Sequence, residues 1–367
     1  MSAHFLFRDR QRLLAIAIVS TLLFILASGV EAQNLQVHFI DVGQGDCIYV
    51  LTPDGYSLLI DAGDVKAGPK VVQYLTALGV KKIDVLVSTH PHSDHIGGMQ
   101  AVLAAFKVGQ VYDSGRLHTS KTFEEYLKTI DALQIPFALA RTGDQIPLGS
   151  QVALNVLWPD GPRTILDYRN LNESSIVLLL EYGQVRFLFT GDAGIESEER
   201  ICTTNLLSKV AVLKVGHHGS RSSTGAQFLK AVAPQTAVIM LGTGNPYGHP
   251  HPEVIRRLEQ GRVQVLRTDQ EGTIIITSDG QDYFIVQPAS YATSQPLDPS
   301  GSTSSLVNVN LASSTELQTL PGIGEVLAQR IIEYRIKVGL FSSPEDLLNV
   351  KGIGVTTLEK IQTLITF

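Results

Sequence analysis

The 367-residue chain contains little cysteine and no excess of positive charge. Its only cysteines, Cys47 and Cys202, lie far apart in the sequence, which excludes a disulfide framework and a zinc site built from thiolates. Lysine and arginine number 29 against 35 aspartates and glutamates, so the formal net charge is −6. Contact with a nucleic acid must therefore depend on local surfaces rather than on the charge of the whole molecule.

A long apolar run covers residues 13–27 and follows three arginines, Arg8, Arg10 and Arg12. The stretch Val30-Glu31-Ala32 then provides a cleavage site of the small-x-small kind. This pattern predicts a secretory signal peptide over residues 1–32. An uncleaved signal anchor is the alternative, although the run is shorter than the roughly 20 residues of a membrane span. We therefore expect an exported protein that contacts the membrane only if this anchor is retained.

Residues 34–287 alternate short β-rich runs with helical patterns, which predicts an α/β domain built as an αββα sandwich. Strands are expected at residues 37–40, 47–51, 57–60, 85–88, 152–157, 176–181, 185–190, 210–215, 237–241 and 273–277. Helices are expected at residues 71–78, 97–105, 123–133, 195–207 and 253–260. Residues 288–305 contain no Lys or Arg and are rich in Ser, Thr and Pro, as is typical of a flexible linker.

Residues 306–367 contain an internal repeat with a period of 30 residues. Residues 320–324, Leu-Pro-Gly-Ile-Gly, correspond to residues 350–354, Val-Lys-Gly-Ile-Gly. A fixed period of this kind marks a duplicated unit, here a helix, a Gly-x-Gly turn and a second helix. The sequence therefore predicts a small all-α domain at the C-terminal end.

Four residues that can bind a metal ion follow the strand expected at residues 85–88. They are His90, His92, Asp94 and His95. A loop that leaves a buried strand is held rigidly, and imidazole and carboxylate groups suit zinc or manganese. The expected strands at 57–60 and 185–190 also lead into carboxylates, Asp61 and Asp192. The sequence thus indicates a metal-dependent hydrolase.

The order of the motifs resembles that of the metallo-β-lactamase-fold hydrolases, and in particular the C-terminal nuclease domain of ComEC-type DNA-uptake channels. The segments that carry this resemblance are residues 38–46, 171–178, 191–192, 215–220 and 245–250. The resemblance implies metal ligands at His90, His92, Asp94, His95, Asp192 and His217, with Asp192 bridging two ions. Many members of the wider fold carry a further histidine ligand before the bridging Asp. Here the only histidine between His95 and Asp192 is His118, so both one and two divalent ions stay open.

Further polar residues have more than one interpretation. Asp61 either orients a ligand histidine or shapes a turn, and Asp41 and Asp46 either contact the metal region or shape a Gly-rich turn. We expect Asp94 or Asp192 to orient the attacking hydroxide. His218 and His249 either protonate the leaving group, hold a phosphate oxygen, or bond the backbone. The residues expected to contact the substrate are Asn172, Ser175 and Ser220.

The repeated tail resembles helix-hairpin-helix motifs and the DNA-binding domain of ComEA-type competence receptors. The residues expected to bind DNA are Gly322, Ile323, Gly324, Lys351, Gly352, Ile353 and Gly354. Glycines allow backbone amides to approach a phosphate, and such contacts read no bases. Five cationic and six anionic residues in this segment keep a protein-interaction domain as the alternative.

Taken together, these patterns predict an exported, metal-dependent phosphodiesterase that acts on DNA and associates with DNA uptake. Two alternatives stay open at this point. The first is a small-molecule metallo-hydrolase of the lactonase kind, because the same ligands also open lactones and lactams. The second is a competence protein that binds DNA without cleaving it.

Overall fold

The computed structural model describes residues 34–161, 170–286, 307–310, 312, 317–337, 341 and 343–366. The expected signal segment, residues 1–32, and the expected linker, residues 288–305, lie outside the described residues. Within the ranges just given, no helix is long and apolar enough to cross a membrane.

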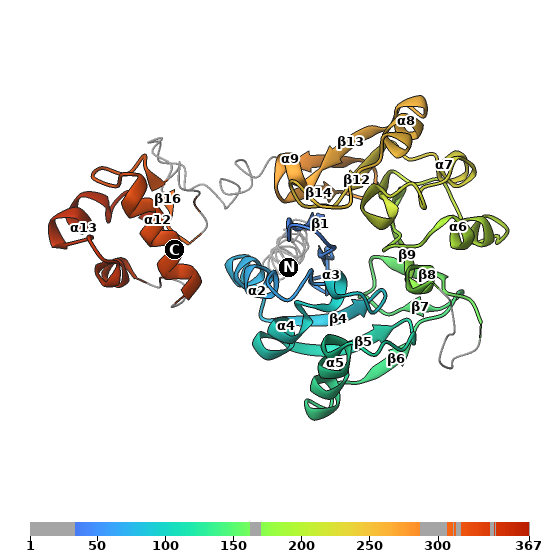
Figure 1. The fold of residues 1–367 in the computed structure, drawn as a ribbon, viewed down its shortest axis with the longest axis horizontal. Coiled ribbons are helices and arrows are strands. Elements are labelled where there is room, and N and C mark those ends of the chain that lie inside the picture. The colour runs from blue at the N-terminus through green and yellow to red at the C-terminus, as the bar shows by residue number, and fades with distance from the viewer. Residues whose placement is uncertain are drawn as a thin grey trace, which may run out of the picture.

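Two β-sheets form the centre of residues 34–286 (Figure 1). The strands of the first sheet are β1 Leu35–Phe39, β2 Ile48–Leu51, β3 Ser57–Ile60, β4 Lys82–Ser88, β5 Lys107–Asp113, β6 Phe137–Leu139, β14 Ile274–Ser278 and β15 Tyr283–Val286. Those of the second are β7 Gln145–Ile146, β8 Ala153–Trp158, β9 Val177–Tyr182, β10 Val185–Phe189, β11 Val212–Lys214, β12 Thr236–Ile239 and β13 Gln264–Arg267. Their orders are β15-β14-β1-β2-β3-β4-β5-β6 and β13-β12-β11-β10-β9-β8-β7.

The two sheets pack face to face through an apolar core. Successive side chains of a strand point to opposite faces, so Ile48 and Val50 lie between the sheets while Tyr49 lies on the outer face. Across the core, the rings of Phe39 and Phe189 are 6.2 Å apart between centroids. Alternating burial of this kind explains why apolar runs in the sequence locate most of the strands.

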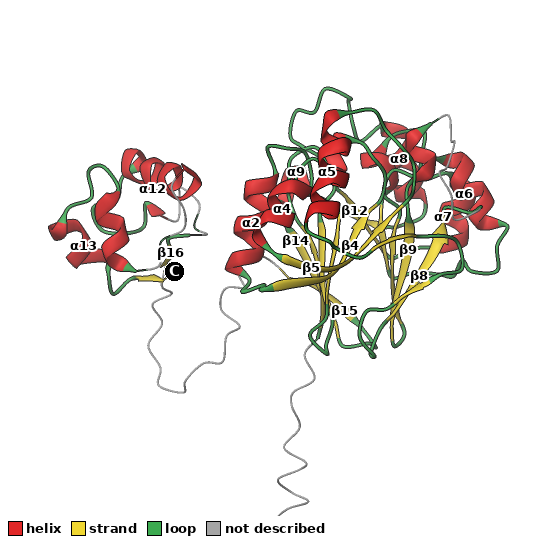
Figure 2. Ribbon diagram, turned by 90° about the horizontal axis from the view of Figure 1, so that it is seen from below, coloured by secondary structure: helices red, strands yellow, loops and turns green. Residues whose placement is uncertain are grey.

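Helices cover the outer faces of both sheets (Figure 2). Side chains of α2 Gly68–Ala77, α4 Met99–Ala105 and α5 Lys121–Ala132 share a core with the first sheet. Those of α6 Ile195–Cys202, α7 Ala226–Val232 and α8 Pro252–Gln260 share one with the second sheet. The predicted αββα sandwich is therefore confirmed.

All five expected helices differ from the observed ones at one or both ends, and two of the differences have a visible local cause. The helix expected at residues 195–207 ends at Cys202, where the Thr203 and Thr204 hydroxyls donate to the carbonyls of Arg200 and Ile201. The helix expected at residues 97–105 begins at Met99 and is preceded by a separate short helix, α3 Ser93–Ile96.

The break between α3 and α4 has a steric origin. A Cβ atom at Gly98 would lie 2.1 Å from the carbonyl oxygen of Ala62, so only glycine permits this approach of the two backbones. Before this contact, Asp94 and His95 lie on the helical turn α3 rather than in an open loop.

The parallel part of each sheet brings several strand ends to one edge. Strands β3 and β4 run parallel, as do β10, β11 and β12. Because the carboxyl ends of parallel strands meet at the same edge of a sheet, the segments after these strands gather there. This edge contains the candidate site.

The C-terminal part is a small helical unit with its own core. Its elements are η3 Pro344–Asn349, α12 Glu325–Lys337, α13 Val355–Ile361 and a parallel pair of short strands, β16 Val307–Asn308 and β17 Ile365–Thr366. Buried side chains repeat at 30 residues, as in the pairs Leu317 and Leu347, Ile323 and Ile353, and Ile331 and Ile361. The predicted duplication is thus visible in the packing. The expectation of an all-α unit was wrong in one detail, since β16 and β17 pair along its edge.

Candidate metal centre

The segment after β4 brings four potential ligands together. His90 and His92 follow the strand in extended backbone, and His92 precedes the first turn of α3, which carries Asp94 and His95. His90 Nε2 lies 3.0 Å from His92 Nδ1, and the rings of His90 and His95 are 4.2 Å apart between centroids. Side chains from one short segment therefore converge on one small volume.

Among the described residues, three groups of three have ligand atoms within 4.8 Å of one another, and one of them is Asp46, Asp61 and His95. The two groups that contain several expected ligands are His90, His92 and Asp192, and Asp94, His95 and His218. Asp192 connects them, because its Oδ2 lies 3.8 Å from His90 Nε2 and its Oδ1 lies 3.3 Å from His95 Nε2. The carboxylate thus occupies the position expected of a bridging ligand.

The backbone of Gly191 and the side chain of Ser175 fix the position of Asp192. It follows β10 after Gly191, whose φ of +49° favours glycine. The Asp192 amide donates to Ser175 Oγ at 3.1 Å, and the Ser175 side chain is buried. Ser175 therefore supports the carboxylate rather than facing a cavity.

The two consecutive histidines after β11 both have left-handed backbone, with φ of 46° at His217 and 54° at His218. Non-glycine residues adopt this region rarely, and strain of this kind is concentrated at functional sites. His218 Nδ1 lies 2.9 Å from the Met240 carbonyl oxygen, and its Nε2 lies 3.3 Å from Asp94 Oδ2. A ring fixed by a backbone carbonyl in this way presents its other nitrogen to the site.

His217, the histidine expected as a ligand, is placed outside both groups of three. Its Nε2 lies 3.8 Å from Asp192 Oδ2, its side chain is 26% exposed, and Asn172 Nδ2 lies 3.2 Å from its ring nitrogens. The geometry therefore favours His218 over His217 as the ligand beside Asp94 and His95. The sequence pattern indicated this loop, but the choice between neighbours depends on backbone angles that it does not specify.

Asp61 and Asp46 both lie in the interior next to the ligands, whereas Asp41 does not. Asp61 accepts a 2.7 Å bond from His95 Nδ1 and further bonds from the amide and hydroxyl of Thr89. This is the contact expected of a residue that orients a ligand histidine. Asp41 instead accepts bonds from the Gly43 amide and from the exposed Lys70, so it shapes the Gly-rich turn.

Lys214 is a residue of the site that the sequence analysis missed. Its side chain is 0% exposed, and its Nζ donates to the Gly191 carbonyl oxygen at 2.8 Å. The same ammonium forms an ion pair with Asp46 and lies 3.9 Å from Asp192 Oδ1. A lysine within an otherwise apolar strand is the signal that could have identified it, because buried charges are paired.

A cavity of about 270 Å³ opens over the ligands. The residues that line it are Gln44, Ser93, His92, Asp94, Asp192, His217, His218, Tyr247 and His249. The three expected substrate contacts, Asn172, Ser175 and Ser220, are buried beside the ligands and do not line this cavity. Gln44, Ser93 and Tyr247 line it although the sequence analysis had assigned them no role. His118 lies near the candidate ligands, with 6.4 Å between the centroids of its ring and the His92 ring.

Burial and neighbouring charges shift the pKa values of the site. Burial lowers the pKa of His90 well below 6.5, so this ring is neutral and one of its nitrogens has a lone pair that can bind a metal ion. Burial alone would also lower the pKa of His95, but Asp192 and Asp61 outweigh it and raise that pKa. Burial alone would raise the pKa of Asp192, but His218 and His95 hold it well below its usual range.

The donor atoms fit a divalent cation. His95 Nε2, His218 Nε2 and Asp192 Oδ1 are buried polar atoms without a hydrogen-bond partner among the described residues. Buried polar atoms in proteins are normally satisfied, so unsatisfied ones that converge on one point indicate a ligand. Imidazole nitrogens with carboxylate oxygens are the donor set that zinc and manganese accept.

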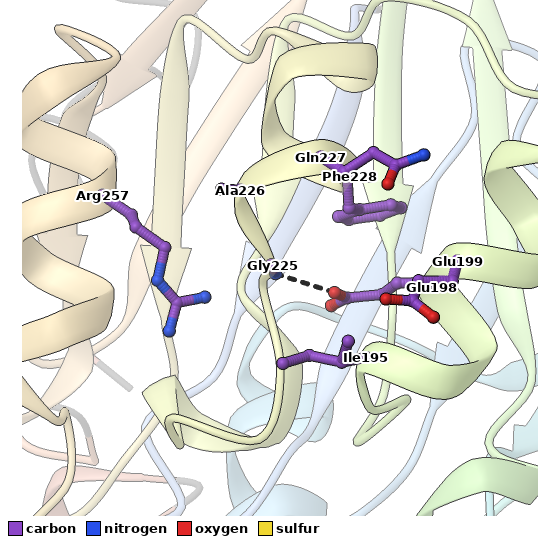
Figure 3. A pocket seen from close by; sticks show the side chains of 8 residues that line it. All are labelled: Ile195, Glu198, Glu199, Gly225, Ala226, Gln227, Phe228 and Arg257. Carbon is purple, nitrogen blue, oxygen red and sulfur yellow. Dashed lines mark hydrogen bonds between the residues drawn. The ribbon is translucent and has the colours of Figure 1, made fainter.

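A second cavity, of about 280 Å³, lies between α6 and α7 (Figure 3). There the Glu198 carboxylate accepts bonds from the backbone amides of Thr224 and Gly225, the latter at 2.7 Å. From α8, Arg257 donates to the carbonyls of Ser223 and Thr224. Glu198 and Arg257 therefore anchor the segment that joins the histidine loop to α7.

The two Gly-Ile-Gly turns of the tail have the same pattern of exposure. Gly322, Gly324, Gly352 and Gly354 are exposed, as is Lys351, whereas Ile323 and Ile353 are buried in the core of the unit. Gly322 and Gly352 have φ of +85° and +101°, which glycine adopts at little cost. The glycine backbone is therefore available to a partner, and the two isoleucines serve packing.

Comparisons with known proteins agree with the structure of the αββα sandwich and of the C-terminal helical unit. Residues 40–243 match the metallo-beta-lactamase superfamily, and residues 302–366 match the helix-hairpin-helix motif. The chain is 34% identical over 256 residues to ComE operon protein 3 of Bacillus subtilis, covering 65% of this chain and 32% of that protein. It is 34% identical over 238 residues to competence protein ComA of Neisseria gonorrhoeae, covering 64% and 31%.

A third relative matches a shorter stretch. ComE operon protein 1 of Bacillus subtilis is 33% identical over 109 residues, which are 29% of this chain and 51% of that protein. The chain spans about a third of the length of the first two relatives. With the two ligand groups at the edge of an αββα sandwich and the superfamily match over residues 40–243, the chain belongs to the metallo-beta-lactamase superfamily and carries a helix-hairpin-helix motif.

Proposed function

We propose that this protein is a metal-dependent phosphodiesterase that cleaves DNA and holds it through the helix-hairpin-helix unit. One observation carries the proposal. A single chain combines two ligand groups connected by Asp192 with two exposed Gly-Ile-Gly turns of identical exposure pattern. The match to the helix-hairpin-helix motif and one relative named as a competence protein support DNA as the substrate.

The metal ligands in this proposal are His90, His92 and Asp192 for one ion, and Asp94, His95, His218 and Asp192 for a second. Zinc or manganese bound there would supply Lewis acidity toward a phosphoryl oxygen and a water of lowered pKa. Asp192 and Asp94 reach the cavity with their carboxylates and would orient the attacking water.

The two histidines expected to act on the leaving group have different surroundings. His218 bonds the Met240 carbonyl with Nδ1, and this proposal assigns its Nε2, 3.3 Å from Asp94 Oδ2, to the second metal ion, so neither nitrogen is left for the leaving group. His249 lines the cavity, and its Nδ1 has no hydrogen-bond partner among the described residues. We therefore assign to His249 the contact with a phosphate oxygen, made through a ring N–H.

The tail would bind DNA through its backbone. Amides next to exposed glycines can approach phosphates closely, and such contacts carry no sequence information. Because DNA bound by the tail would remain on the same chain as the cavity, its effective concentration at the metal site would rise. We further propose that the protein is exported through residues 1–32 and acts beside the DNA-uptake machinery, since one of its relatives is named as a competence protein.

The test compares substrates with the purified full-length chain. Linear DNA, plasmid DNA, a lactone and a thioester are offered after EDTA treatment, and again after Mn²⁺ or Zn²⁺ is restored. The proposal expects cleavage of DNA only with metal and little turnover of the two small esters. Rapid lactone turnover without DNA cleavage would establish the small-molecule alternative, and DNA binding without cleavage under any metal would establish the non-catalytic one.

A further inference from the structure

Tyr247 is an exposed aromatic side chain at the mouth of the metal cavity. Its ring is 61% exposed, more than that of any other large aromatic residue among the described positions, and it lines the same cavity as Asp94 and Asp192. An aromatic ring that stays in water does not gain the free energy that burial of its apolar surface would provide. Its place on the wall of the cavity therefore calls for an explanation other than packing.

The loop that carries Tyr247 is fixed by hydrogen bonds. Asn245 Nδ2 donates to the Gly242 and His249 carbonyl oxygens at 3.2 and 2.8 Å. In return, the His249 amide donates to Asn245 Oδ1 at 3.0 Å. These bonds restrain the loop after β12 on both sides of Tyr247, so the backbone that carries the ring is fixed.

One neighbour of the Tyr247 ring is His249. The two rings are 5.6 Å apart between centroids with an angle of 26° between their planes, which is a stacked arrangement. His249 in turn lies next to His217, with 5.7 Å between ring centroids, and so connects Tyr247 to the ligand cluster. The exposed ring is thus the outer member of a row of aromatic side chains that leads from solvent toward Asp192.

We propose that Tyr247 forms a stacking site for the nucleobase next to the phosphodiester that is cleaved. This inference rests on the proposed function, and it adds that the substrate is DNA with an unpaired base at that position. Aromatic rings bind bases of any sequence through their faces. In a duplex those faces are covered by neighbouring base pairs, so only a single strand, a frayed end or a flipped nucleotide could use the site.

Tyr247 shares one cavity with the candidate ligands. Tyr247 and Asp192 line a single cavity of about 270 Å³, so a phosphate at the ligands and a base at Tyr247 belong to adjoining parts of one substrate. Gln44 and Ser93 line the same cavity and offer neutral polar groups there. Neutral contacts suit a sugar that carries no charge of its own.

The test uses the full chain with Mn²⁺ and a labelled single-stranded oligonucleotide whose cleavage positions have been mapped. A second oligonucleotide lacks the base beside the cleaved bond. The variants are Tyr247→Leu, which removes the ring, and Tyr247→Phe, which removes only the hydroxyl. Tyr56→Leu is the control, because Tyr56 is also an exposed tyrosine, at 44%, but precedes β3 and so lies at the opposite edge of the sheet.

We expect Tyr247→Leu to raise KM for the intact oligonucleotide about tenfold and to lose the preference for the base-containing substrate. Tyr247→Phe and Tyr56→Leu should match the wild type. Wild-type kinetics for Tyr247→Leu would overturn the inference. So would a loss of activity on removing the base that is as large in Tyr247→Leu as in the wild type, because the ring and the base would then act independently. Loss of activity in Tyr247→Phe would overturn it in favour of a role for the hydroxyl. If the wild-type chain cleaves no DNA at all, the proposed function fails first and this inference with it.

Discussion

Lys214 Nζ and the Asp46 carboxylate form an ion pair next to the ligand cluster, and both side chains are almost completely shielded from solvent. The pair joins β11 of one sheet to the Gly-rich turn after β1 of the other. It therefore connects the two halves of the sandwich at the edge where the ligands gather. A charged contact of this kind has consequences for stability that can be measured.

Replacing Lys214 with methionine should lower the free energy of unfolding by about 3–5 kcal/mol, because a buried carboxylate would lose its cation. The double variant Lys214→Met with Asp46→Asn should recover part of this loss, since no unpaired charge remains. Urea unfolding of the metal-free protein, followed by the fluorescence of the single tryptophan, Trp158, gives both values. A Lys214→Met variant as stable as the wild type would show that the pair does not exist in solution.

Asp61 orients His95 and should therefore control metal affinity. Asp61→Asn keeps a residue that tolerates the φ of 58° at this position but removes the carboxylate that accepts from His95 Nδ1. We expect metal affinity to fall by about 10–100-fold, as for other residues that hold a ligand histidine. Titration against a chromophoric chelator measures this change. The control is Asp131→Asn, an exposed residue on α5, which should bind metal as the wild type does.

Glu198 should make stability depend on pH. Burial raises its pKa to about 7 from an ordinary value of 4.5, and the amides of Gly225 and Thr224 offset only part of that effect. The folded state then binds more protons than the unfolded state between these two values, so the free energy of unfolding should fall as pH rises from about 4.5 to 7 and level off above. Each unit of pKa difference corresponds to about 1.4 kcal/mol.

The variant Glu198→Gln isolates this contribution. Asp113, whose pKa burial raises to about 6, has an effect of the same sign, so the informative quantity is the difference between variant and wild type. Urea midpoints at pH 5 and pH 7.5, in EDTA, should differ less in Glu198→Gln than in the wild type. An unchanged difference would mean that Glu198 is ionised in the folded protein at both pH values.

The C-terminal helix-hairpin-helix unit should contribute to DNA affinity but not to the rate of cleavage. Lys351 is exposed beside Gly352, and Lys351→Glu should weaken binding to plasmid DNA several-fold and reduce its dependence on salt. The same variant should cleave a short oligonucleotide at the wild-type rate. Lys209→Glu makes the same change of charge at an exposed position before β11, and DNA binding should not change there. Equal loss of affinity in both variants would point to net charge rather than to the hairpins.

The sequence predicted the parts of the fold that repeat a local pattern. Apolar runs located β1, β3 and β10, but the polar β13 and the two-residue β7 were missed because neither shows a buried run of its own. Candidate ligands that lie close together in the sequence, such as His90 and His92, could be proposed from the sequence alone. The ion pair of Lys214 with Asp46 could not, because it depends on how segments some 170 residues apart meet at one edge.

Cleavage of DNA by the wild type and by Asp192→Ala tests the central claim most directly. Both full-length proteins are stripped with EDTA, checked for equal binding to the same plasmid, and assayed before and after Mn²⁺ is restored. The account predicts cleavage by the wild type only with metal, and cleavage by Asp192→Ala at least about a hundredfold slower, because the carboxylate that connects the two ligand groups is gone. Cleavage by the wild type without metal, or by Asp192→Ala at the wild-type rate, would contradict it.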